Sequence, residues 1–142
     1  MSTVRVVIVG VGNYACALVQ GVHGDGHAAD DELVRGVMHI NPGGYHVRDI
    51  EFAAACDVDA TKVGQDLSVA IFAPPNNTMR FAEVEVPPLG VPVQWGMARN
   101  GVGKYLSQVI TKRPGPSINI VSGLQETGTD VLVNYLPVGA CA

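Results

Sequence analysis

Residues 4–15 read VRVVIVGVGNYA, an apolar strand followed directly by Gly-x-Gly-x-x-Ala and the start of a helix. In this turn Gly10 permits the sharp exit from the strand, and Gly12 has no Cβ to keep a phosphate away from the backbone. Ala15 lets helix and strand pack closely, and a helix that opens near Asn13 presents unpaired N–H groups and its positive dipole end. The pattern predicts a bound phosphate-bearing nucleotide. The alternative is a strand-to-helix turn that needs its glycines only for structure.

Composition narrows the class of protein and the kinds of partner. The chain has 142 residues, 47% of them hydrophobic and 15% charged, which indicates one globular domain over 1–142. Its net charge is -4 and its Arg and Lys residues form no basic stripe, so we expect no nucleic-acid partner. The apolar runs 6–11 and 131–138 are far shorter than the roughly 20 residues that span a bilayer, so we expect no membrane partner. Because glycines interrupt any signal-peptide core, the expected location is the cytoplasm.

A second strand is predicted over 50–56, where the residues are almost all apolar, as in a parallel strand covered on both faces. It ends at Asp57, whose carboxylate can accept hydrogen bonds from the adenine ribose and would repel a 2′-phosphate, which favours NAD over NADP. The usual spacing between the glycines and this acid is about 20 residues. A polar insert at about 25–49, with a turn at 41–44, explains the longer spacing here. Asp59 is the second candidate for the ribose, and alternatively it caps the next helix.

The rest of the chain predicts helices, an irregular excursion and a third strand. The expected elements are a helix over 60–72, an irregular excursion over about 73–101 with Val91 and Val93 as its strand fragment, a helix over 102–111, a helix from a cap at Ser117 to Thr127 ended by Gly128, and a buried strand over 130–136. The expected fold class is therefore α/β. We predict a Rossmann-like, three-stranded parallel sheet, a βαβαβ half with a long insertion that is incomplete at the C-terminus.

Cysteine and histidine positions predict no metal site. The three widely spaced cysteines imply buried free thiols and no disulfide framework; they are Cys16, Cys56 and Cys141. His23 and His27 have a spacing that could bind zinc on a helix. Because Gly24 and Gly26 disfavour a helix there, we expect solvated loop histidines instead.

Six motifs occur in an order that matches a known family. They are VGxGN followed by Ala at 9–15, YHVRD at 45–49, DVDAxKVG at 57–64, NNT at 76–78, GxGKY at 101–105 and DVLVxYLPVG at 130–139. Together they resemble the N-terminal part of the prokaryotic inositol-3-phosphate synthases, and the resemblance covers nearly the whole chain.

The resemblance implies a Rossmann domain with NAD as cofactor and an intramolecular lyase or isomerase activity. The family converts D-glucose 6-phosphate to 1D-myo-inositol 3-phosphate, a step of inositol and phospholipid biosynthesis. Bound NAD oxidises the sugar at C5, the ketone permits enolisation and an internal aldol closure, and NADH then reduces the ring ketone. The cofactor is regenerated within one cycle.

The same resemblance assigns residues to the cofactor. The implied NAD-binding residues are Gly10, Gly12, Asn13, Tyr14, Asp57, Asn77, Thr78, Leu136 and Pro137. Family members more often have a small residue in place of Tyr14, whose side chain must either tilt away from the cofactor or crowd it. No catalytic residue is assigned, because the family's catalytic and tetramerising domain follows the Leu-Pro-Val-Gly motif. Lys62, Lys104 and Lys112 fall in the cofactor half and are expected to be solvated.

The sequence is compatible with three functions. The chain is part of a synthase, as a fragment or as one half of a split enzyme, and meets glucose 6-phosphate only when the catalytic half is supplied. Alternatively it is a nucleotide-binding module without chemistry, or a truncated product. A third buried-type strand without a covering helix predicts marginal stability, and with it self-association or a partner over that strand.

Overall fold

The computed structural model describes residues 3–81, 83–96, 108–111 and 119–137. Its elements are, in chain order, β1 (Val4–Val9), α1 (Asn13–Asp25), the 3-10 helices η1 (Pro42–Gly44) and η2 (Val47–Asp49), β2 (Ile50–Asp57), α2 (Leu67–Ala70), β3 (Val93–Trp95), α3 (Ile120–Thr127) and β4 (Val131–Asn134).

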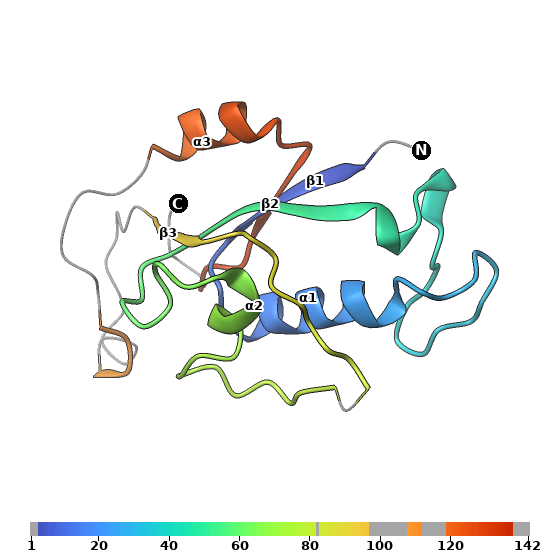
Figure 1. Cartoon of the computed structure of the whole chain (residues 1–142), viewed down its shortest axis with the longest axis horizontal. Coiled ribbons are helices and arrows are strands. Elements are labelled where there is room, and N and C mark those ends of the chain that lie inside the picture. The colour runs from blue at the N-terminus through green and yellow to red at the C-terminus, as the bar shows by residue number, and fades with distance from the viewer. Residues whose placement is uncertain (1–2, 82, 97–107, 112–118, 138–142) are drawn as a thin grey trace.

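Four parallel strands form one sheet in the order β3-β2-β1-β4. Helices α1 and α2 lie on one face of the sheet and α3 lies on the other (Figure 1). This arrangement is the α/β, Rossmann-like class that the sequence predicted, and the prediction is confirmed. The predicted number of three strands is wrong, because Val93–Trp95 pairs with the end of β2 as a short edge strand.

A bulge in β2 decides which side chains reach the core. Val6 of β1 pairs with Phe52, whereas Val7 pairs with Ala54, so Ala53 is an extra residue. In an unbroken strand Phe52 and Ala55 would face opposite sides of the sheet. The bulge lets both enter the same core cluster.

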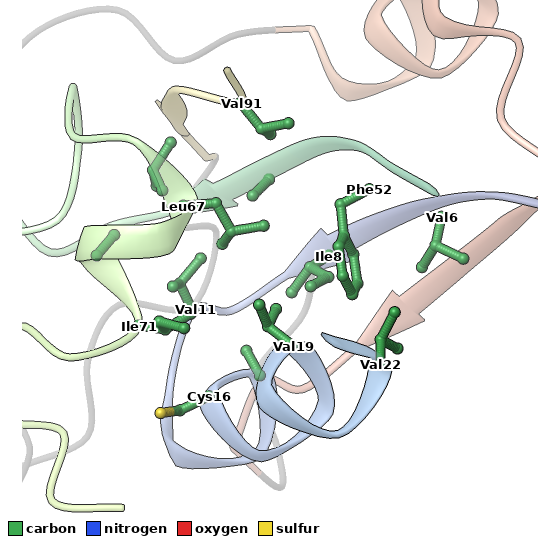
Figure 2. Packing of buried hydrophobic residues seen from close by; sticks show 14 residues of the cluster. Val6, Ile8, Val11, Cys16, Val19, Val22, Phe52, Leu67, Ile71 and Val91 are labelled. Carbon is green, nitrogen blue, oxygen red and sulfur yellow. The ribbon is translucent and has the colours of Figure 1, made fainter. Parts of the chain in front are cut away.

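The main core lies between the sheet and the two helices on its lower face in Figure 1. Ile8 of β1, Val19 of α1 and Leu67 of α2 are fully buried within it (Figure 2). Burying an aliphatic side chain of this size stabilises the fold by about 1.5–3 kcal/mol. One core thus joins the first βα unit to the second and fixes the junction that follows β1.

Helix α1 ends at Asp25, where the predicted polar insert begins. The helix continues through Gly21 and Gly24 to Asp25, so His23 is a helical residue and the prediction of a loop there is wrong. Gly24 has a packing reason to lack a side chain, because a Cβ at this position would lie 2.7 Å from Cγ2 of Val84. None of the described helices, α1 included, is long and apolar enough to cross a membrane.

Gln20 holds the irregular excursion against α1. Its side chain is fully buried, its Nε2 donates to the carbonyl of Met79 at 3.2 Å, and its Oε1 accepts from the N–H of Phe81 at 2.8 Å. A segment without regular structure is thereby bonded to a helix side chain and not to a neighbouring strand. The buried amide satisfies backbone groups that would otherwise lack partners.

The predicted helix over 60–72 is largely wrong, because α2 has only four residues, Leu67–Ala70. Gly64 interrupts it with a φ of +88°, a left-handed conformation that an α-helix excludes. Asp59 caps no helix; its Oδ1 accepts from the N–H and the hydroxyl of Thr61 at 2.9 and 2.8 Å, which closes a local turn. The observed cap of α2 is Asp66.

Helix α3 and strand β4 lie where the sequence predicted them, but β4 is more exposed than predicted. α3 is capped by Asn119 and ends at Thr127, with Gly128 as its C-cap at a φ of +59°. The predicted cap Ser117 lies outside the described residues. β4 forms where it was expected, but Val131 and Leu132 are 44% and 42% exposed, so the prediction of a buried strand is wrong. In the described sheet β4 is an edge that pairs only with β1. Of the helix predicted over 102–111, only 108–111 are described, and these form no α-helix.

Asp66 connects α2 to the segment before β3. Its Oδ1 accepts from the N–H and the hydroxyl of Ser68 at 3.0 and 2.6 Å and from the N–H of Leu89 at 3.0 Å, and its Oδ2 accepts from the N–H of Val91 at 2.9 Å. Burial alone would raise the pKa of Asp66, but these hydrogen bonds outweigh burial and lower the pKa to about 2.

We expect Asp66→Asn to lower the free energy of unfolding by about 1–3 kcal/mol at neutral pH, because an NH2 group replaces an oxygen that accepts a backbone hydrogen bond. The folded-state pKa lies below the ordinary 3.8, so the carboxylate stabilises the fold above that value. This contribution is lost as the pH falls through 3.8 towards 2. Urea unfolding measures the difference between wild type and variant, which should shrink over this window. Asp31→Asn, at an exposed position, is the matched control, and equal destabilisation by both changes would contradict the assignment.

Candidate functional site

Gly10 makes the turn between β1 and α1 in a space that only glycine fits. Its φ is +95°, and a Cβ would lie 3.2–3.3 Å from the backbone of Tyr135 and Leu136, where the chain leaves β4. The N–H of Gly10 donates to the carbonyl of Cys56 at 2.9 Å. The turn therefore sits at the carboxyl ends of three adjacent strands, β2, β1 and β4.

Gly12 is the N-cap of α1 and faces open space. A Cβ built on it would meet nothing within 4 Å, and no side chain caps the helix. The first N–H groups of α1 and the positive end of its dipole thus have no side-chain acceptor from the N-cap residue. This is the arrangement that binds anions at helix N-termini.

Asp57 lies at the end of β2, directly beside the glycine turn. Its Oδ2 accepts from the N–H of Val11 at 2.7 Å, and its Oδ1 accepts from the N–H groups of Val58 and Asp59 at 2.7 and 2.9 Å. The side chain is partly exposed, and Oδ2, which has one donor, can accept a further hydrogen bond, whereas Oδ1 already accepts two. Asp59, the second candidate, is only 1% exposed, so the geometry favours Asp57 as a ligand group.

Asn13 joins the segment 77–78 to the start of α1. Its Oδ1 accepts from the N–H groups of Asn77 and Thr78 at 2.8 and 3.0 Å and from the hydroxyl of Thr78 at 2.8 Å. Its Nδ2 donates to Oδ1 of Asn77 at 2.9 Å. Three of the predicted cofactor residues are therefore in direct contact, although 64 positions separate Asn13 from Asn77.

Two residues that the sequence did not place in the site lie behind the turn. Asn76 donates from Nδ2 to the carbonyls of Val11 and Ile71 at 3.1 and 2.9 Å. Its Oδ1 accepts from the ammonium of Lys62 at 2.9 Å. Lys62 is only 3% exposed, so the prediction of a solvated lysine is wrong for this residue. Lys104 and Lys112 lie outside the described residues.

The other predicted cofactor residues lie on the β4 side of the turn. The Tyr14 side chain is 74% exposed, and its ring centroid lies 5.9 Å from that of Tyr135. Leu136 approaches Gly10 through its backbone, and its N–H donates to Oδ1 of Asn134 at 2.9 Å. Pro137 is exposed at the end of the described chain.

The cysteines and histidines follow the sequence prediction in part. Cys16 and Cys56 are buried free thiols, as expected, and Cys141 lies outside the described residues. Burial raises the pKa of both thiols, in Cys56 to about 11 with a further contribution from Asp57, which keeps them protonated. Burial lowers the pKa of His23, whose Nε2 has no hydrogen-bond partner among the residues that the structure describes. Within the described residues no group of three or more His, Cys, Asp or Glu side chains is arranged to hold a metal ion.

The strand order, the glycine turn and the acidic strand end together define a Rossmann-like α/β domain, a class that suggests a nucleotide cofactor. No protein-family model matches the chain. Over 137 residues, 96% of the chain, it is 51% identical to the inositol-3-phosphate synthase of Mycolicibacterium smegmatis and 52% identical to that of Mycobacterium tuberculosis. The chain is thus homologous to the inositol-3-phosphate synthases, which confirms the resemblance seen in its motifs. It spans 37% of the length of these relatives, consistent with their N-terminal part.

Solved structures share the fold of this chain. The crystal structure of Ari2 matches 96% of the chain with a TM-score of 0.72 and 28% identity, and the match covers 38% of Ari2. A myo-inositol-1-phosphate synthase-related protein from Thermotoga maritima matches 94% of the chain with a TM-score of 0.56. At 21% identity, this second likeness shows the fold alone.

Proposed function

We propose that the chain binds NAD and is the cofactor-binding portion of an inositol-3-phosphate synthase. The observation that carries the proposal is the juxtaposition of Gly12, at the open N-terminus of α1, with the carboxylate of Asp57. A dinucleotide needs both features, an N–H cradle for its diphosphate and an acceptor for its adenosine ribose. The homology to proteins named inositol-3-phosphate synthase supports the same assignment.

The residues of the turn would each have a distinct part in binding. The N–H groups at Gly12 and Asn13 would bind the diphosphate, and Gly10 would hold the turn in the required geometry. Asp57 would accept hydrogen bonds from the ribose hydroxyls and repel a 2′-phosphate. The segment at Asn77 and Thr78, held by Asn13, would border the cofactor. When bound, NAD supplies a hydride acceptor and, after reduction, a hydride donor.

The proposed overall reaction is the conversion of D-glucose 6-phosphate to 1D-myo-inositol 3-phosphate by internal oxidation, aldol cyclisation and reduction. By the resemblance, the groups that handle the sugar phosphate belong to the part of the relatives that this chain does not match. We therefore propose that the isolated chain binds NAD without turning over the sugar phosphate. A nucleotide-binding module without chemistry makes the same prediction for the isolated chain, and activity after addition of a catalytic half distinguishes the two.

Calorimetric titration with NAD and NADP tests the cofactor assignment. We expect saturable binding of NAD and at least about tenfold weaker binding of NADP, because the Asp57 carboxylate repels a second phosphate. Asp57→Asn should weaken NAD binding by about ten- to a hundredfold and narrow the preference for NAD. Asp31→Asn removes a similar charge at an exposed position and should leave both affinities unchanged. The absence of saturable heat with both nucleotides would contradict the proposed function.

We also propose that another polypeptide covers β4, either a second copy of this chain or a partner. The support is the exposed apolar edge, where Val131 and Leu132 stand on a strand that pairs only with β1 in the described sheet. Sedimentation velocity of the isolated chain should show concentration-dependent association that Leu132→Lys reduces. Val69→Lys, at a 57% exposed position on α2, is the control and should associate like the wild type. A monomer at all concentrations that also binds no hydrophobic dye would overturn this proposal.

A further inference from the structure

Val11 is the residue of the glycine turn whose two backbone groups both have side-chain partners. Its side chain is fully buried, its N–H donates to Asp57 at 2.7 Å, and its carbonyl accepts from Nδ2 of Asn76 at 3.1 Å. In a trans peptide the carbonyl of one residue and the N–H of the next point in opposite directions. A carbonyl of Val11 held towards Asn76 therefore directs the N–H of Gly12 away from Asn76.

The orientation of the Asn76 amide is fixed by what surrounds it. Two carbonyls, those of Val11 and Ile71, accept from Nδ2, while Oδ1 accepts from the ammonium of Lys62. A flipped amide would place its NH2 against the three-donor ammonium and its oxygen against two acceptors. Lys62 is thus the donor that favours the orientation of the Asn76 amide in which Nδ2 donates to the carbonyl of Val11.

In the described part of the chain, the Lys62 ammonium also has no counter-charge nearby. All 13 Asp and Glu residues of the chain belong to its described part, and none has an oxygen within 4.0 Å of this ammonium. Lys62 is only 3% exposed, and a buried charge without a paired anion is unfavourable. An anion bound at the adjacent turn would reduce this imbalance.

We propose that Lys62 is a positioning residue for the phosphates of a nucleotide, acting through Asn76 on the Val11–Gly12 peptide. The proposal rests on the proposed function, because it takes the glycine turn as the phosphate site. Lys62 keeps the Asn76 amide oriented and Asn76 holds the carbonyl of Val11, so the N–H of Gly12 points away from Asn76. A Cβ at Gly12 would meet nothing within 4 Å, which leaves room for a phosphate at this residue. The ammonium adds a positive charge behind a loop that receives a diphosphate.

Calorimetric NAD titrations of a double-mutant cycle test the relay. We expect Lys62→Met and Asn76→Ala each to weaken NAD binding by about tenfold, and the double variant to bind about as weakly as either single variant. Arg35→Met removes a positive charge from an exposed position in the insert and should bind NAD like the wild type. Lys62→Arg keeps a charged donor and should stay within about threefold of the wild type.

The outcomes separate the relay from the cofactor site. If the wild type binds no NAD, the proposed function fails and this inference fails with it. If the wild type binds and folded Lys62→Met binds equally well, only the role of Lys62 is overturned. Losses that add up in the double variant, or an equal loss in Arg35→Met, would also overturn the relay. If Lys62→Met does not melt cooperatively, the Lys62→Arg variant decides the question. Near-wild-type affinity of Lys62→Arg supports the proposal. A folded Lys62→Arg variant that binds NAD about tenfold more weakly overturns it, and a tenfold change in affinity corresponds to about 1.4 kcal/mol.

Discussion

The absence of a side chain at Gly10 is the constraint that brings the parts of this molecule together. With a φ of +95° the chain leaves β1 and turns into α1 while the backbone of Tyr135 and Leu136 passes at 3.2–3.3 Å from the missing Cβ. Any other residue there would be strained and would also push β4 away from β1. The close approach lets the N-terminus of α1 and the exit of β4 share one edge of the sheet.

Around that turn, polar side chains from distant parts of the chain replace the contacts that regular structure would provide. Asp57 and Asn76 bind the two sides of Val11, and Asn13 binds the segment that follows Asn76. Further along α1, Gln20 holds the backbone of the same excursion at Met79 and Phe81. The excursion is therefore an ordered border of the site, held by side chain to backbone hydrogen bonds, although it contains little regular structure.

The sequence sufficed for the features that depend on local patterns. Apolar runs predicted β1 and β2, the glycine spacing predicted the turn, and the position of Asp57 at the end of a strand identified it as the ribose ligand candidate. Other features depend on long-range contacts that no local pattern encodes. Gly64 breaks the predicted helix because its N–H bonds to Val93 across the sheet edge at 2.8 Å, and Lys62 is buried because Asn76 accepts its ammonium. The strand fragment predicted at Val91 and Val93 overlaps β3 at Val93, but three residues are too short to show a period that would place this fragment in the sheet.

An amide-resolved NMR titration of the labelled chain with NAD tests the account most directly. If the turn after β1 is the phosphate site, the backbone amides of Gly10, Gly12 and Asn13 should shift saturably and together. The amides of Gly36 and Gly43, in the insert beyond the other end of α1, should stay unchanged. Saturable shifts confined to the insert, or no shifts at any NAD concentration, would contradict the assignment of the glycine turn as a nucleotide site.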